Sequence, residues 1–193
     1  MSSIEYAEVI NEVLKKRRST RKYCLEEIPE KTLFLIAKAG TYAPSSGNGQ
    51  PCRFLIINNN SVINKLLDNS IQENEKLTTK ELKQSNILWS NNYRQVSAAI
   101  IILEDKESPF PEYIGHDCPL AAANIIIMAT SIGYGTTYVT VTINEKGIRK
   151  TLNISDRYIP YCTILIGRSC DKAQQHMKKD AEEVIWINRI SEK

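Results

Sequence analysis

The sequence predicts an α+β fold, a three-layer sandwich in which helices flank a central mixed sheet of four or five strands. Three observations predict it. Short apolar runs of strand length alternate with segments of helical periodicity, no Pro/Gly/Ser-rich linker divides the chain, and one long helix is apolar almost all round. With 193 residues the chain is long enough for one hydrophobic core. We therefore expect a single domain over residues 1–193.

The predicted strands are apolar runs bounded by residues that favour turns. The first run ends at three consecutive asparagines, the second precedes a loop with two prolines, and the last one ends at Gly167. Apolar runs of this kind are typical of strands that are buried on both faces. The third strand, residues 136–142, is assigned instead from its alternation and its β-branched residues. The runs assigned as strands are residues 53–57, 97–103, 136–142 and 161–166.

The predicted helices form the outer layers. The first carries its apolar residues at helical spacing, and the second begins after Pro29 and ends at Gly40. A third, over residues 120–131, has Asp117 as its expected N-cap and Gly133 after its end. Residues 61–95 are polar with scattered apolar positions, so we expect helices of a cover there and treat 61–115 as a lid region. The apolar face of the first helix consists of Tyr6, Val9, Ile10, Val13 and Leu14.

Composition excludes several classes of protein. Lys and Arg total 25 against 22 Asp and Glu, and a net charge of +3 does not indicate nucleic acid or an anionic membrane. The longest mostly apolar run, residues 119–132, is shorter than the ~20 residues of a membrane-spanning helix. Five widely spaced cysteines favour reduced thiols and a cytoplasmic location. Their spacing relative to the two histidines fits no metal site, and we expect none.

A basic segment directly follows the first helix. It contains Arg17, Arg18, Ser19 and Arg21, and guanidinium groups match phosphate oxygens in pairs while a hydroxyl adds a further donor. Two other interpretations stay open. Cations at a helix C-terminus are favoured by the helix dipole and are often only solvated. The segment could also belong to a non-enzymatic module that binds RNA or another anion.

A second segment, residues 43–51, is a polar turn that leads into a predicted strand. Its composition alone is that of an ordinary Pro/Gly/Ser turn. It also combines Ser, Asn and Gln side chains, whose neutral donors and acceptors suit the edge of a planar heterocycle. No glycine-rich nucleotide loop and no recognisable nucleophile or catalytic triad accompany it, so enzyme chemistry here would depend on a bound cofactor.

Taken together, the segments resemble the nitroreductase family of FMN-dependent oxidoreductases. The resemblance covers essentially the whole chain in order. It is carried by RRSTRKY at 17–23, APSSGNGQP at 43–51, DCPLAAANI at 117–125 followed by GYG at 133–135, IPYCTILIGR at 159–168, and KKDAEEV at 178–184.

The resemblance implies which residues bind FMN. It assigns the phosphate and ribityl chain to Arg17, Arg18, Ser19 and Arg21. It assigns a turn that approaches the flavin from the neighbouring subunit to Pro44, Ser45, Ser46 and Asn48. It assigns contact with the isoalloxazine to Val139, Thr140 and Val141, and completion of the phosphate site to Lys178. The resemblance gives no catalytic side chain.

The resemblance also implies activity and assembly. We expect a homodimer with flavin sites at the subunit interface and an exchanged C-terminal segment. We expect hydride transfer from NADH or NADPH through flavin N5 to a small acceptor, such as a nitroaromatic or a quinone, with ping-pong kinetics. The same fold with reductive dehalogenation or flavin fragmentation is the alternative. Two residues depart from the family pattern: Lys178 replaces an Arg, and Cys52 replaces a Trp.

Overall fold

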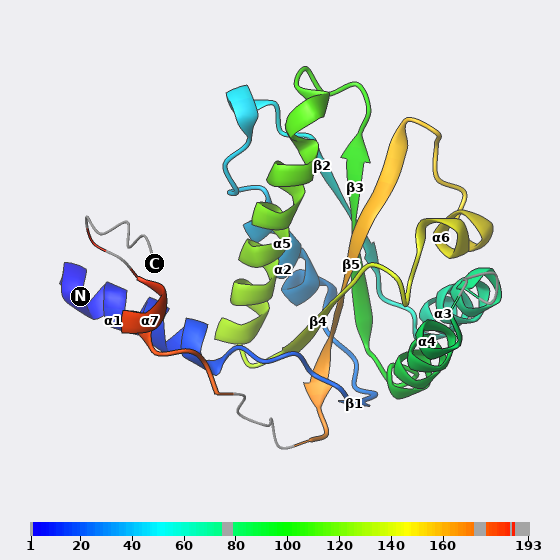
Figure 1. Cartoon of the computed structure of the whole chain (residues 1–193), viewed down its shortest axis with the longest axis horizontal. Coiled ribbons are helices and arrows are strands. Elements are labelled where there is room, and N and C mark those ends of the chain that lie inside the picture. The colour runs from blue at the N-terminus through cyan, green and yellow to red at the C-terminus, as the bar shows by residue number, and fades with distance from the viewer. Residues whose placement is uncertain (1, 75–78, 172–176, 186, 188–193) are drawn as a thin grey trace, which may run out of the picture.

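A five-stranded sheet lies between two layers of helices in the computed structural model (Figure 1). The structure describes residues 2–74, 79–171, 177–185 and 187, without the side chains of 81 and 82. The strands are β1 (Tyr23–Cys24), β2 (Cys52–Ile57), β3 (Ala98–Asp105), β4 (Gly135–Val139) and β5 (Tyr158–Ser169). All four predicted strands are therefore present, and β1 is an addition too short to show a pattern in the sequence.

Strand β5 organises the sheet. It pairs with β1, β3 and β4, and β3 pairs in turn with β2. The sequence predicted a mixed sheet, whereas these named strand pairs are all antiparallel. The parallel pairing in the described part of the chain is a single bridge between Ser19 and Thr136. That bridge places the basic segment against the first residues of β4.

Helices cover both faces of the sheet. Figure 1 shows α2 and α5 on one face, and α3, α4 and α6 on the other. No helix within the described residues is long and apolar enough to cross a membrane. The helices are α1 (Ser3–Lys16), α2 (Glu30–Gly40), α3 (Asn60–Asn74), α4 (Lys80–Asn92), α5 (Ile114–Ser131), α6 (Glu145–Thr151) and α7 (Ala181–Val184), with single 3-10 turns η1 (Ser46–Asn48) and η2 (Pro111–Tyr113).

The central strands are apolar on both faces because each face meets a helical layer. Along β3, alternate side chains point to opposite sides of the sheet. Ala98, Ile100 and Ile102 belong to the core under α2 and α5, whereas Ala99, Ile101 and Leu103 belong to the core under α3 and α6. The continuous apolar run that predicted a doubly buried strand therefore has this cause.

The region expected to form a lid contains elements of two kinds. Helices α3 and α4 lie outside the sheet, while β3 lies between β5 and β2 within it. The helical part has the position of a cover, and its role as a lid stays a prediction. The strand within 61–115 is part of the central layer.

Helix α5 begins earlier than predicted. It starts at Ile114, so Asp117 is not an N-cap but lies inside the first turn, where its side chain is buried. Pro119 therefore lies within the helix and has no N–H for the carbonyl of Gly115. The hydroxyl of Tyr161 donates to that carbonyl at 3.3 Å, which satisfies the acceptor that proline leaves. The contact with Tyr161 thus accompanies an early start of α5 that the local sequence pattern does not predict.

Two of the five cysteines are joined, contrary to the expectation of reduced thiols. Cys24 in β1 and Cys170 after β5 form a disulfide, and their Cα atoms are 5.3 Å apart. The pairing of β1 with β5 brings them together, and the Cys170 N–H also donates to the carbonyl of Lys22 at 3.1 Å. The disulfide removes one support for the expected cytoplasmic location.

Candidate functional site

The basic segment is held against the start of β4 by backbone contacts. The N–H of Thr20 donates to the carbonyl of Thr136 at 2.9 Å, and the hydroxyl of Thr137 donates to the carbonyl of Thr20. Gly135 allows this approach, since a Cβ at that position would lie 2.2 Å from the hydroxyl oxygen of Thr20. The backbone of residues 17–21 is therefore fixed, while its charged side chains extend outward.

The three arginines of this segment have different surroundings. Arg18 donates to the carbonyls of Lys15 and Arg17, as expected for a cation at a helix C-terminus. Arg21 lies over the ring of Trp89, with its guanidinium carbon 4.8 Å from the ring centroid. The Arg17 guanidinium has no hydrogen-bond or ion-pair partner among the described residues. It is the member of the group whose donors are available to an anion.

The turn before β2 is held by the first turn of α5. The N–H of Ser46 donates to both carboxylate oxygens of Asp117, at 3.2 Å each, and its hydroxyl lies 3.4 Å from one of them. The N–H of Gln50 donates to the hydroxyl of Ser45 at 3.0 Å. Gly47, Asn48 and Gln50 all have positive φ values, between 46° and 56°. Left-handed backbone at two non-glycine residues is strained and typical of functional turns.

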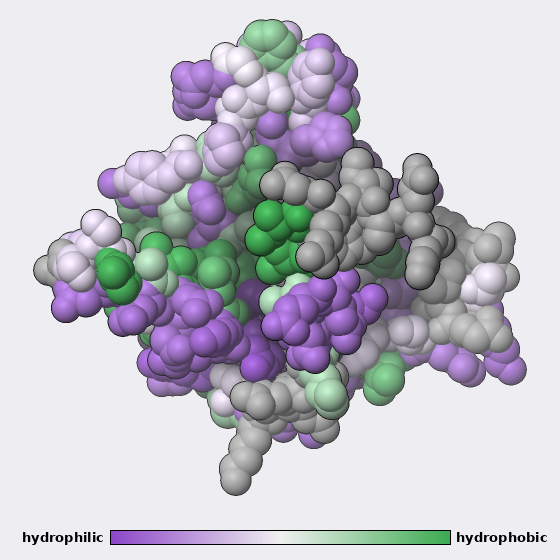
Figure 2. Space-filling view, turned by 60° about the vertical axis from the view of Figure 1, so that its left-hand side comes forward, coloured by the Kyte–Doolittle hydropathy of each residue, from purple (hydrophilic) through white to green (hydrophobic). Residues whose placement is uncertain are grey.

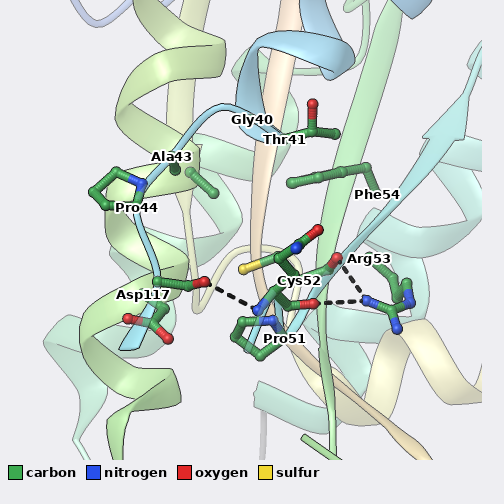
Figure 3. A pocket seen from close by; sticks show the side chains of 12 residues that line it. Gly40, Thr41, Ala43, Pro44, Pro51, Cys52, Arg53, Phe54 and Asp117 are labelled. Atoms are coloured by element: carbon green, nitrogen blue, oxygen red, sulfur yellow. Dashed lines mark hydrogen bonds between the residues drawn. The ribbon is translucent and has the colours of Figure 1, made fainter. Parts of the chain in front are cut away.

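A cavity of about 300 Å³ opens beside this turn (Figure 3). That volume lies at the lower end of the range for small-molecule sites. Neutral polar and apolar groups make up most of its wall, with Arg53 and Asp117 as the charged exceptions. It is lined by Gly40, Thr41, Ala43, Pro44, Ser45, Gln50, Pro51, Cys52, Arg53, Phe54, Asp117 and Ala121.

A buried carboxylate supports the strand end next to the cavity. Asp105, 2% exposed, accepts two hydrogen bonds from Arg157 at 2.7 Å and one from Arg53 at 2.9 Å. The Arg157 hydrogen bonds hold the pKa of this carboxyl below its usual value despite the opposing effect of burial. The N–H of Asp105 also donates to the carbonyl of Pro51. These contacts fix the point where the turn enters β2.

The two predicted parts of the flavin site lie at opposite ends of α5 in one chain. The turn is bonded to Asp117 near the start of the helix, whereas the basic segment pairs with Thr136, beyond its end. The 15 residues from Asp117 to Ser131 are separated end to end by 14 rises of ~1.5 Å, or about 20 Å. Figure 1 shows the same separation between η1 and the segment after α1. Within one chain, the two predicted parts of the flavin site therefore lie far apart.

The remaining predicted residues lie elsewhere. Val139 is buried at the end of β4, Thr140 and Val141 are exposed beyond it, and the Val141 carbonyl accepts from Asn74 at 2.9 Å. Lys178 is exposed, and its ammonium has no partner within the described part of the chain. No contact in the structure joins either group to the arginines, so their roles at the flavin stay predictions.

Sequence reasoning did not identify three features of these regions. Asp117 anchors the turn, Gly135 admits Thr20, and Cys118 lies beside Cys52. Gly135 had a usable signal, because a glycine at the start of a β-branched run indicates close backbone approach. Cys52 and Cys118 are 66 residues apart in the sequence, and no sequence pattern indicated that they would lie side by side. Among the described residues, no group of three or more His, Cys, Asp and Glu could hold a metal ion.

An uncovered apolar surface accompanies the site. No residue of α1 is buried within the described part of the chain: the exposed fraction is 49% for Leu14 and 72% for Ile4. In the described tail, the exposed fraction is 55% for Val184 and 78% for Ile187. Figure 2, in which this side of the molecule is turned forward, shows hydrophobic surface among the hydrophilic residues. A helix of this amphipathic pattern normally buries its apolar face against a partner.

Comparisons with known proteins agree in fold and family. A family model described as the nitroreductase family matches residues 14–168. A relative from Methanothermobacter thermautotrophicus, provisionally named NADH dehydrogenase/NAD(P)H nitroreductase, is 28% identical over 160 residues, which cover 81% of this chain and 75% of the relative.

Solved structures share the fold. A nitroreductase with bound FMN from Desulfitobacterium hafniense superposes with a TM-score of 0.79 at 18% identity. One from Bacteroides fragilis, also with bound FMN, has a TM-score of 0.78 at 23% identity. Each comparison covers 93% of this chain and 98% of the other.

Proposed function

Because the chain belongs to the nitroreductase family, we propose that it is an FMN-dependent oxidoreductase that passes a hydride from NADH or NADPH to a small acceptor. A nitroaromatic or a quinone represents the acceptor class, and one pocket serves both half-reactions in turn. The match over residues 14–168 carries this proposal, because that range holds the basic segment and the polar turn together. The bound FMN of the two solved neighbours supports the choice of cofactor.

The free donors of the basic segment fit a phosphate monoester. Arg17 has an unpartnered guanidinium, and the neighbouring Ser19 is exposed. The fixed backbone between Thr20 and Thr136 holds both residues at the start of β4. Charge-assisted hydrogen bonds from such a fork are about twice as strong as neutral ones. Lys178 would add a single ammonium charge to the phosphate site, where the family has the two-pronged guanidinium of an Arg. This requires the C-terminal segment to approach the phosphate.

We further propose a homodimer with the flavin between the subunits. The separation of about 20 Å along α5 prevents one chain from contacting the ring and the phosphate with both predicted parts. The exposed apolar residues of α1 and of residues 184–187 supply surface for a second copy. Exchange of the C-terminal segment would bury Val184 and Ile185 on the partner.

FMN, when bound, supplies the hydride acceptor and donor, which explains why no nucleophile or catalytic triad stands out. The chain's own part is to bind and orient. Arg17 and Ser19 hold the phosphate end, and the turn presents the hydroxyl of Ser45 and the amide of Asn48. The largely neutral cavity wall limits water at the open face. The cytoplasmic location stays a prediction.

Flavin binding tests the proposal directly. The purified protein is expected to be yellow and to bind one FMN per chain in a fluorescence titration. Arg17→Ala removes charge-assisted hydrogen bonds of about 1.5–3 kcal/mol, so its FMN Kd should rise at least about tenfold. Arg21→Ala should have a smaller effect, because that side chain stacks on Trp89.

Lys22→Ala is the matched control, since it removes the same charge from the same segment outside the predicted site. Equal FMN affinity in Arg17→Ala and Lys22→Ala would refute the phosphate assignment. A colourless protein that FMN cannot reconstitute would refute the cofactor. Turnover with NADH or NADPH and a panel of nitroaromatic, quinone and halogenated acceptors then separates the proposed reaction from reductive dehalogenation.

A further inference from the structure

Two free thiols meet in the wall of the cavity. Cys52 begins β2 and Cys118 lies in the second turn of α5, and their sulfur atoms are 3.2 Å apart. Cys118 is completely buried, whereas Cys52 is half-buried and lines the cavity. Figure 3 shows the Cys52 side chain among the lining residues, with its sulfur directed towards α5. One thiol is therefore reachable from the cavity, and the other lies behind it.

The remaining cysteines do not share this arrangement. Cys24 and Cys170 are already joined in a disulfide away from the cavity. Cys162 is buried in β5, and burial raises the pKa of its thiol to about 12. It does not line the cavity. Cys52 and Cys118 are thus the two free thiols in the described chain that combine contact with each other and access to a small molecule.

The proton of the pair is unequally shared. The hydrogen bond with Cys118 lowers the pKa of Cys52, against the opposing effects of burial and of the Asp117 and Glu104 carboxylates. The same hydrogen bond, together with burial, raises the pKa of Cys118. The hydrogen bond thus favours ionisation of Cys52, the thiol that faces the cavity. An attacking thiol that is accessible and ionised, with a protonated thiol beside it, is the arrangement that thiol–disulfide exchange requires.

We propose that Cys52 and Cys118 are a redox-active dithiol that reduces a low-molecular-weight disulfide admitted to the cavity. The cavity volume of about 300 Å³ suits a small molecule. This activity goes beyond the proposed flavin chemistry and does not require FMN. One chain is sufficient for this activity, because the cavity is lined by residues of a single chain.

The exchange balances in two steps. The Cys52 sulfur attacks one sulfur of the substrate, the substrate S–S bond breaks, and the first substrate thiol leaves with the proton that Cys52 gave up. Cys118 then loses its proton and attacks the Cys52 sulfur, and the second substrate thiol leaves with that proton. The substrate disulfide gains two electrons and two protons, and the two cysteines become a disulfide. The sulfurs need to approach by about 1.2 Å from 3.2 Å to reach the ~2.05 Å of an S–S bond.

Oxidised glutathione is the probe for a first test on the full-length purified protein, with and without FMN. The protein is incubated with the probe, free thiols are blocked, and the cysteine-containing peptides are mapped by mass spectrometry under non-reducing conditions. We expect a Cys52–Cys118 disulfide peptide in the parent protein and release of two glutathione molecules per chain. Peptide mapping distinguishes this bond from Cys24–Cys170 in the same sample.

Variants assign the two roles. Cys118→Ser should retain one glutathionyl group on Cys52, because the resolving thiol is gone. Cys52→Ser should leave Cys118 unmodified, because it is buried. Cys162→Ser, a change at a thiol outside the cavity, should behave as the parent does.

Two results would overturn the proposal. One is a parent protein in which Cys52 and Cys118 both remain free after treatment with the probe. The other is a parent protein that stops at glutathionylated Cys52, which would mean that Cys118 does not resolve the mixed disulfide. Both readouts are independent of flavin binding, so they differ from a failure of the proposed function.

Discussion

The two ends of α5 are built in different ways. At the Asp117 end, mostly neutral groups line a cavity, and the backbone of the turn donates to the buried carboxylate of Asp117. At the other end, the backbone of the basic segment is fixed against β4, but its cations point outward, and Arg17 has no described partner. The cavity at the Asp117 end therefore has its shape before any ligand binds. The basic segment at the other end carries positive charge that an anionic ligand could neutralise.

This difference indicates how affinity and selectivity are divided. An exposed cation attracts any phosphate and gains little from shape, whereas a preorganised cavity discriminates by fit. A cofactor that bridges the two ends across a dimer would be retained mainly by the arginine end. The choice of acceptor would then depend on the cavity end, where Cys52 replaces the large ring of the family.

The largest expected effect is at the arginine end. Cys24 and Cys170 are 146 residues apart, and a disulfide that closes so long a loop strongly restricts the unfolded chain. Cys170→Ser should lower the free energy of unfolding by about 4 kcal/mol, measured by urea denaturation. Dithiothreitol should have the same effect on the parent protein and none on the variant. Five free thiols in the denatured, untreated protein would contradict the bond.

The next effect is at the cavity end. Asp105→Ala leaves Arg53 and Arg157 without their buried acceptor and should cost about 3 kcal/mol in urea denaturation. Glu107→Ala is the control, since Glu107 pairs with the same Arg157 but is 67% exposed, and it should cost less than ~1 kcal/mol. Equal losses in the two variants would show that burial of Asp105 contributes nothing.

Acid provides a second measurement on the same carboxylate. Its pKa in the folded protein is lowered from 3.8, first by the Arg157 hydrogen bonds, so the unfolded chain takes up the proton at higher pH than the folded one does. The stability that Asp105 contributes is therefore complete above pH 3.8 and is lost as the pH falls below it. The urea midpoint of the parent should decline in that range more steeply than that of Asp105→Asn. Parallel declines would argue against the assignment.

A smaller effect is expected from the contact that fixes the basic segment. Gly135→Ala places a Cβ 2.2 Å from the Thr20 hydroxyl oxygen, so the segment must shift, at a cost of about 2 kcal/mol. Gly115→Ala is the control, because a Cβ there meets nothing within 4 Å, and alanine favours the helix. FMN affinity should fall in the first variant alone. Unchanged affinity in Gly135→Ala would mean that the position of residues 17–21 does not set phosphate binding.

Local pattern was sufficient for most of the elements and failed where distant residues decide. The four buried strands and the helix after Pro29 follow from periodicity and turn residues, and they are confirmed. The start of α5 was placed too late, because Tyr161 compensates for Pro119 from another strand. The disulfide was missed for a similar reason: strand pairing, which the sequence does not state, brings Cys24 and Cys170 together.

The sequence predicted which segments form the candidate site but not where these segments lie relative to one another. The basic run and the polar turn stood out by composition, and the structure holds each of them in place by specific contacts. Their separation along α5 could not be inferred, since it depends on which end of the helix each segment meets. The anchoring role of Asp117 and the thiol pair also depend on tertiary packing between α5 and the segment around β2.

Strand β5 imposes an order on folding. Among the described strands, β1 and β4 each pair with β5 alone, and β3 pairs with β5 as well as with β2. Because β5 spans residues 158–169, the sheet can close only after the other four strands have been synthesised. Until then the edge of β3 that pairs with β5 is unpaired, and an open strand edge is a template for aggregation. Closure of the sheet is consequently governed by how quickly β5 pairs with β3 on one side and with β1 and β4 on the other.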